Sequence, residues 1–146
     1  MTADLGAVVR RAWAAYDAGD EQGFRACVTD DWREFDFGDP EGESAGVDEI
    51  LGSMAAQSAA FPDKQTEVLF EVVEGDVVAQ YTISRATHLG RYFDLEPTGE
   101  RVTATEMCFH QMRGGLIART WAATAEAGFY TQLTGRPPPE KLDNQT

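Results

Sequence analysis

The first part of the chain shows the hydrophobic spacing of amphipathic helices. Hydrophobic residues recur at intervals of three and four between Leu5 and Tyr16, which predicts a helix that ends near Gly19. Asp20 is a good N-cap residue, so a short second helix is expected to begin after it. The residues expected to face inward from this second helix are Phe24, Cys27 and Val28.

A loop and a third helix follow. The segment from Asp36 to Gly46 is rich in Gly, Asp and Glu, as loops are. Hydrophobic residues from Val47 to Met54 recur again with helical spacing. Phe61-Pro62-Asp63 is expected to stop this helix, because the residue before a proline disfavours helical backbone.

After this point the pattern changes to the period of two that is typical of strands. Four strands are predicted, at 66–73, 77–85, 101–112 and 116–124. The glycine pair Gly114-Gly115 predicts a hairpin turn between the last two strands. The pattern predicts an α+β fold, in which a curved antiparallel sheet of about four to six strands wraps around three N-terminal helices and encloses a cavity.

Length and charge limit the possible functions. We expect a single domain over residues 1–135 and a flexible tail over residues 136–146. The net charge of −13 argues against binding to nucleic acid or to a membrane surface, since both need a basic face. Residues Met1 to Gly6 lack the features of a signal peptide, and two cysteines are too few for a disulfide scaffold. We therefore expect a cytoplasmic protein with reduced thiols.

A series of short motifs runs through the second half of the chain. They are Phe61-Pro62-Asp63, Gly75-Asp76, Thr87-His88-x-Gly90, Pro97-Thr98-Gly99, Gly114-Gly115, Trp121 and Gln132-Leu133. In this order and spacing they resemble the SnoaL-like polyketide cyclase family, which has the cone-shaped fold of nuclear transport factor 2. The resemblance implies a small apolar or aromatic ligand, no cofactor, and a homodimer formed through the outer face of the sheet.

The glycines and the histidine of these motifs also have structural interpretations. Gly90 and Gly99 are expected to supply backbone freedom at turns. We expect His88 to brace the loop that contains it rather than to take part in chemistry.

The resemblance also shows what this chain lacks. Cyclases of the family use an aspartate as general acid–base, and the corresponding position here is Ala125. The nearest acid is Glu126, which would point to the opposite face if the last strand continued through it. The group that replaces the aspartate has to come from another part of the chain.

Glu106, Cys108 and His110 share one face of the third predicted strand, with successive Cα atoms roughly 6.5–7 Å apart. If this face lines the cavity, Glu106 and His110 are the candidate catalytic residues. In the alternative, Met107 and Phe109 face the core, and the polar side chains are in water. The resemblance favours the first interpretation and the alternation of polarity favours the second, so both remain open.

Further residues are candidates for contact with a ligand. Tyr16 lies on the buried face of the first helix, where a core aromatic is the favoured interpretation and contact with the cavity is the alternative. Glu34 and Asp36 could reach the mouth of the cavity, although a solvated position is favoured for both. Arg85 could hold a carboxylate or enolate, or form an ion pair on the surface. The substrate-binding candidates are Tyr16, Trp32, Phe35, Tyr81, Arg85, Cys108 and Trp121.

Several kinds of site have no support in the sequence. The two histidines are 22 residues apart without clustered acids, so no metal site is expected, and no glycine-rich phosphate loop follows a strand. Three functions remain: a cofactor-independent cyclase or hydroxylase of aromatic polyketide biosynthesis, a non-catalytic binder of small molecules, and an accessory protein. The enzyme predicts an ionisable group inside the cone, the binder an apolar cavity, and the accessory protein a filled one.

Overall fold

The computed structural model describes residues 4–123 and 125–137. Its first three helices are α1 (Leu5–Ala18), α2 (Glu21–Arg25) and α3 (Val47–Ala60). Gly19 ends α1 in the left-handed conformation, and the side chain of Asp20 accepts a hydrogen bond from the backbone N–H of Gly23. Phe61 caps α3. The predicted helices are therefore confirmed with their ends. Within the described residues, no helix is long and apolar enough to cross a membrane.

The strands form one six-stranded sheet of order β2-β1-β6-β5-β4-β3. Their bounds are β1 Val28–Asp36, β2 Ser44–Ala45, β3 Gln65–Glu74, β4 Val77–Thr87, β5 Arg101–Arg113 and β6 Leu116–Ala122. The four predicted strands correspond to β3, β4, β5 and β6. All neighbouring strands are antiparallel except β1 and β6, which run parallel, so the sheet is mixed.

Three elements were not predicted. β1 follows directly after α2 and lies between β2 and β6, and β2 lies inside the segment expected to be a loop. The third is α4 (Ala125–Thr134), which begins where the sequence suggested the end of a strand. The condition under which Glu126 would point to the opposite face is not met, because the strand does not continue there and the backbone is helical. The predicted flexible tail falls mostly on residues 138–146, outside the described part of the chain.

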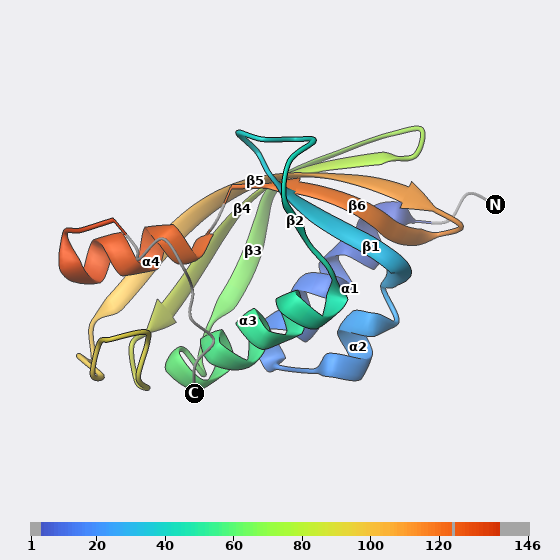
Figure 1. Cartoon of the computed structure of the whole chain (residues 1–146). Helices are drawn as coiled ribbons and strands as arrows, with labels where there is room; N and C mark the ends of the chain where they lie inside the picture. Colours follow the sequence, from blue (N-terminus) through green and yellow to red (C-terminus); the bar gives the residue numbers. More distant parts are fainter. Residues whose placement is uncertain (1–3, 124, 138–146) are drawn as a thin grey trace.

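The sheet curves over the helices and leaves one side open. Figure 1 shows α1, α2 and α3 gathered under its concave face, with α4 alongside its other end. Buried side chains form two clusters: one joins α1 and α2 to the sheet, and the second packs around Phe61 and Phe129 beneath α4. This arrangement confirms the predicted α+β fold with a curved sheet.

The loop after β4 is braced by His88, as expected. His88 is fully buried, and its Nδ1 lies 3.0 Å from Thr98 Oγ1 and accepts the backbone N–H of Thr98. Gly99 has a positive φ of 72°, which confirms the expected turn. Gly90 differs: its φ is not positive, and a Cβ would lie 2.0 Å from the carbonyl oxygen of Ala59, so close packing requires the glycine.

Candidate active site

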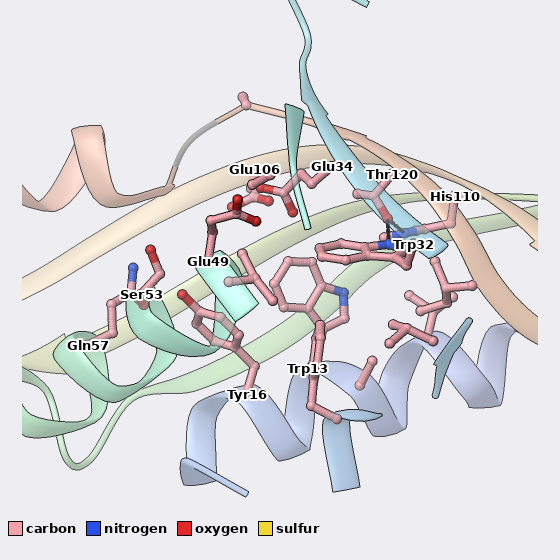
Figure 2. Close-up of a pocket in the computed structure, with 18 of the residues that line it drawn as sticks. Trp13, Tyr16, Trp32, Glu34, Glu49, Ser53, Gln57, Glu106, His110 and Thr120 are labelled. Carbon is pink, nitrogen blue, oxygen red and sulfur yellow. Dashed lines mark hydrogen bonds between the residues drawn. The ribbon is translucent and has the colours of Figure 1, made fainter. Parts of the chain in front are cut away.

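A cavity of about 290 Å³ lies between the concave face of the sheet and the helices α1 and α3 (Figure 2). Its volume is at the lower end of the range of small-molecule sites. The apolar part of its lining is Val9, Ala12, Trp13, Tyr16, Phe24, Val28, Trp32, Ala45, Ile50, Ile117 and Ala123. The polar part is Glu34, Glu49, Ser53, Gln57, Lys64, Glu106, His110 and Thr120. Such a mainly aromatic and aliphatic wall with a few polar groups suits a flat, apolar organic ligand.

β5 decides between the two interpretations of its polar face. Glu106 and His110 are 9% and 4% exposed and both line the cavity, whereas Met107 and Phe109 are 53% and 44% exposed. The strand alternates regularly between buried and exposed positions over its whole length. The interpretation that placed Glu106 and His110 in water is therefore wrong.

Three carboxyl groups gather at one end of the cavity. Figure 2 shows the side chains of Glu34, Glu49 and Glu106 pointing into the same region. Glu49 accepts a hydrogen bond from the backbone N–H of Gly46, which caps the start of α3. Glu34 comes from β1 and Glu106 from β5, so the sheet brings together residues that are distant in sequence. This end of the cavity is rich in proton-accepting oxygens.

Cys108 lies behind this cluster. Its Sγ donates a hydrogen bond of 3.0 Å to Glu106 Oε1. Burial raises the pKa of the thiol well above its usual value, and the negative charges of Glu106 and Glu34 raise it further. Cys108 is thus a neutral donor that holds one carboxylate oxygen of Glu106. It is buried but does not line the cavity, which corrects its expected place as a ligand contact.

His110 forms a second polar group in the cavity wall. Its Nδ1 lies 2.8 Å from Thr120 Oγ1, and the indole N–H of Trp32 donates to the same hydroxyl at 3.1 Å. Burial lowers the pKa of His110 to about 4. The imidazole is therefore neutral near pH 7, and a neutral ring can donate or accept one hydrogen bond on each nitrogen according to its tautomer.

The other end of the cavity contains a buried cation. Lys64 Nζ forms a 2.8 Å ion pair with Asp17 Oδ1 and lies 4.9 Å from the centre of the Tyr16 ring. Gln57 is also buried here, and its Oε1 has no hydrogen-bond partner among the described residues. Tyr16 therefore lines the cavity, as predicted, and it also packs against a lysine that the sequence did not single out.

Trp13 is held in the cavity wall by a chain of polar contacts. Its indole N–H donates to Gln80 Oε1 at 2.8 Å, and Gln80 Nε2 donates to Glu71 Oε1 at 2.8 Å. Arg10 forms an ion pair with the second oxygen of Glu71. The chain fixes the plane of an aromatic ring against which a flat ligand could stack.

Four predicted contact residues lie outside the cavity. Phe35 and Trp121 stack on each other with ring centres 5.8 Å apart, and Tyr81 stacks on Phe70 at 6.3 Å. Arg85 is exposed and pairs with Glu67 at 3.0 Å, so its surface interpretation is correct. These side chains belong to the outer face of the sheet, because the alternation of each strand sends them away from the helices. The expectation that Phe35, Tyr81, Arg85 and Trp121 line the cavity is thereby corrected.

Several cavity residues were missed by the sequence interpretation. Glu34 was expected in solvent, whereas β1 turns it into the cavity, and Gln57, Lys64 and Thr120 were not proposed. The strand period could have found Thr120, since it alternates with the outward-facing Trp121. Gln57 and Lys64 carry no comparable signal, because only the packing of α3 over the sheet places them there. The side chains of Ala125 and Glu126 lie outside the described residues.

No group of three or more His, Cys, Asp or Glu side chains in the described part of the chain could hold a metal ion.

Comparisons with known proteins agree with this arrangement. Residues 7–133 match the family model of the SnoaL-like polyketide cyclases. No curated protein sequence matches the chain. Among solved structures, AclR, a candidate hydroxylase from Streptomyces galilaeus, is 24% identical with a TM-score of 0.80, covering 97% of this chain and 88% of AclR. IdmH, a candidate polyketide cyclase from Streptomyces antibioticus, is 23% identical with a TM-score of 0.75, covering 90% of this chain and 99% of IdmH. At these identities the likeness concerns the fold.

Proposed function

Because this chain belongs to the SnoaL-like polyketide cyclase family, we propose that it is a cofactor-independent enzyme that acts on a polycyclic aromatic polyketide intermediate. The observation that carries the proposal is the burial of Glu106 and His110 in the wall of an otherwise largely apolar cavity. Burying ionisable groups costs free energy, so their presence in a ligand-sized hollow indicates chemistry.

Glu106 is the proposed general acid–base. In its ionised form it can take a proton from the carbon next to a carbonyl, and the same carboxyl group can return a proton to the alkoxide that forms on ring closure. This takes over the part for which relatives use an aspartate at the position of Ala125. Cys108 supports the role, because its thiol fixes one oxygen of Glu106 and leaves the carboxyl group oriented.

Glu34 adds a second carboxyl group near the first. Both Glu34 and Glu106 act electrostatically on the Cys108 thiol, which supports their closeness. Two carboxyl groups that share a region of low dielectric disfavour the state in which both are ionised. We propose Glu34 as a second acid–base group beside Glu106.

Ring closure by aldol addition is the favoured reaction, because it balances without any oxidant: a C–C bond forms and one proton moves from carbon to oxygen. Hydroxylation is the alternative. The deprotonated, electron-rich ring would add molecular oxygen to give a hydroperoxide, and a two-electron reductant from solution would convert the hydroperoxide to the hydroxyl product and water.

The test uses an enolisable aromatic ketone. 2-Tetralone exchanges its acidic C–H protons with deuterium in D2O, and NMR follows the rate. We expect the protein to accelerate this exchange and Glu106→Gln to lose the acceleration, because an amide cannot accept the proton at neutral pH. In assays with aromatic polyketide intermediates, followed by mass spectrometry, Glu106→Gln and His110→Ala should each abolish turnover while circular dichroism shows an intact fold.

Glu67→Gln is the matched control, since Glu67 lies on the exposed surface and pairs with Arg85. It should retain full activity. Normal exchange and turnover in both Glu106→Gln and His110→Ala would show that the acid–base is elsewhere, and a protein with no effect on any substrate would favour the non-catalytic binder.

We also propose that two copies associate through the outer face of the sheet in the cytoplasm. Two rows of side chains cross this face: Phe70, Tyr81 and Met107 in one, and Val72, Ala79, Phe109, Trp121 and Phe35 in the other. Phe70 and Val72 are 70% and 62% exposed. An exposed apolar surface of this kind is typical of a protein interface.

A further inference from the structure

One nitrogen of His110, a residue of the cavity wall, is buried without a hydrogen bond. Its Nε2 is buried and has no partner among the described residues, and its ring lines the cavity. Leaving a buried polar atom unpaired is unfavourable, because its hydrogen bond to water is lost and not replaced. Since most buried polar atoms in proteins are paired, such an exception needs an explanation, and a bound ligand or water that completes the pairing is one. The question is whether Nε2 offers that ligand a proton or a lone pair.

The answer follows from the residues on the other side of the ring. An indole N–H can only donate, so Trp32 Nε1 donates to Thr120 Oγ1 and uses one lone pair of the hydroxyl. The remaining contact of the hydroxyl among the described residues is His110 Nδ1, at 2.8 Å. The Thr120 hydroxyl has one hydrogen to donate, and this hydrogen finds an acceptor only if it points to His110 Nδ1. Nδ1 is then the acceptor, and the proton of the neutral imidazole lies on Nε2.

Burial supports the same state of charge. The pKa of His110 is lowered to about 4 by burial in the cavity wall, so the ring is neutral under physiological conditions. A neutral ring with its proton on Nε2 presents the cavity with a hydrogen-bond donor and no acceptor. His110 is therefore unsuited to act as a base in this tautomer.

We propose that His110 is a fixed hydrogen-bond donor for a carbonyl or enolate oxygen of the ligand, and that Thr120 and Trp32 are positioning residues that hold its tautomer. The identity of the ligand rests on the proposed function, whereas the tautomer is a property of the protein alone. A preorganised donor of this kind stabilises negative charge that develops on oxygen. In a conjugated polycyclic ketone the charge left by proton removal spreads over the fused rings, so the oxygen bound by His110 need not adjoin the carbon that Glu106 deprotonates.

A fixed hydrogen-bond donor at His110 narrows the class of substrates that the cavity can bind. The atom of the ligand placed beside His110 has to accept a hydrogen bond, as a ring ketone or quinone oxygen does. A ligand with only a donor or a hydrocarbon edge at that point leaves the N–H unpaired and is disfavoured.

The tautomer can be measured directly in the protein without a ligand. The chain has only two histidines, so a long-range ¹H–¹⁵N NMR spectrum contains two imidazoles, and His110→Gln identifies which signals belong to His110. We expect the pattern of a ring protonated on Nε2 at pH 7. A ring protonated on Nδ1 would overturn the proposal, whatever the enzyme assays show.

Two variants test the positioning residues, with a conservative control. Thr120→Val removes the hydroxyl, and Trp32→Phe removes the N–H but keeps an aromatic ring against Phe24. Each should increase the Nδ1-protonated population, because Nδ1 no longer has to accept. Thr120→Ser retains the hydroxyl and should keep the wild-type spectrum. An unchanged tautomer in both folded variants would show that Thr120 and Trp32 do not control it.

A pair of probes tests the donor. Fluorenone and fluorene have the same fused rings, but only fluorenone carries a carbonyl oxygen. We expect the ratio of their affinities to fall about fivefold in His110→Phe, the effect of losing one hydrogen bond of about 1 kcal/mol. An unchanged ratio would overturn the donor role in binding. If neither probe bound the wild-type protein, the assignment of the cavity to aromatic ketones would fail, while the NMR spectrum would still decide the tautomer.

Discussion

At the residue scale, the burial of His110 makes the stability of the protein depend on pH. Its folded-state pKa of about 4 lies below the usual value of 6.5, so the unfolded chain binds a proton first as the pH falls. The contribution of the neutral His110 side chain to the free energy of unfolding is complete above pH 6.5. It is lost as the pH falls towards 4. From pH 7 to pH 5 we expect the wild-type protein to lose about 2 kcal/mol more of its unfolding free energy than His110→Gln. Urea unfolding at the two pH values measures this difference.

The comparison with His110→Gln isolates this effect, because the other ionisable groups are the same in both proteins. The carboxyl groups of Glu34 and Glu106 remain in both proteins, and their effects largely cancel in the difference. Equal losses in the two proteins would mean that His110 is charged, or exposed to water, at pH 5.

Replacing Gln57 should raise the stability of the protein and lower its affinity for a ligand. Its buried Oε1 has no partner among the described residues, and its side chain lines the cavity near Tyr16. Gln57→Leu removes the unpaired oxygen, so we expect the free energy of unfolding to rise by about 1 kcal/mol. The affinity for a hydroxylated aromatic ligand should fall, because the acceptor is lost. Thermal unfolding and a titration with 1-naphthol test the two effects.

The same substitution at an exposed helix position is the control. Gln22 lies on the exposed surface of α2, and Gln22→Leu should change neither quantity by more than about 0.5 kcal/mol. A destabilised Gln57→Leu protein would indicate that the amide is paired, for example through an ordered water.

Much of the candidate site could be predicted where one strand contains it. The period of β5 alone places Glu106 and His110 on the same face of the strand. Which face points into the cavity was decided only by the structure, in which Met107 and Phe109 are exposed. Phe35 and Trp121 were misplaced because aromatic residues occupy both faces of this sheet. Hydrophobicity alone cannot tell a cavity wall from an outer face that is itself apolar.

At the element scale, a buried ion pair fixes the end of α1 to the segment between α3 and β3. The side chain of Lys64 is 4% exposed and that of Asp17 11%. Thr66 Oγ1 also donates to Asp17 at 3.2 Å. Removing one partner of a buried pair leaves an uncompensated charge, so Asp17→Asn should destabilise the protein by about 3 kcal/mol in urea unfolding.

The double variant Asp17→Leu/Lys64→Met removes both charges and should recover much of this loss, because neither charge is then left unpaired. The exposed pair Arg85–Glu67 is the matched comparison, and Glu67→Gln should cost less than about 1 kcal/mol. A loss of the same size in Asp17→Asn and Glu67→Gln would show that water solvates Lys64.

The elements themselves were predictable to the extent that their sequence pattern is regular. β4 and β5 alternate without interruption, whereas β1 contains Asp30 and Asp31 and shifts its register between Val28 and Arg33. Such a strand shows no period of two. Its place in the sheet comes from pairing with β6, a contact across most of the chain that no local pattern records.

At the scale of the whole molecule, net charge opposes the association that the outer face favours. Each copy carries a net charge of −13, and two like-charged copies repel each other over distances that salt screens. If the two apolar rows form the dimer interface, the dissociation constant of the dimer should fall as the NaCl concentration rises from 20 to 500 mM. Over this range the Debye length shrinks from roughly 20 to 4 Å, so the repulsion between the two copies is screened. Sedimentation velocity measures the constant at each salt concentration.

One pair of variants separates the interface from a general effect of added charge. Phe70→Asp places a carboxylate in the first apolar row, on the edge strand β3, and should yield monomers, because a desolvated, unpaired charge is costly. Leu89→Asp makes the same change at a 53% exposed side chain in the loop after β4, outside both rows, and should dimerise as the wild-type protein does. Dimers that persist in Phe70→Asp would show that the interface is not the apolar face. Dimers that weaken as salt is added would place the interface on a charged surface, since salt also screens the attraction between opposite charges.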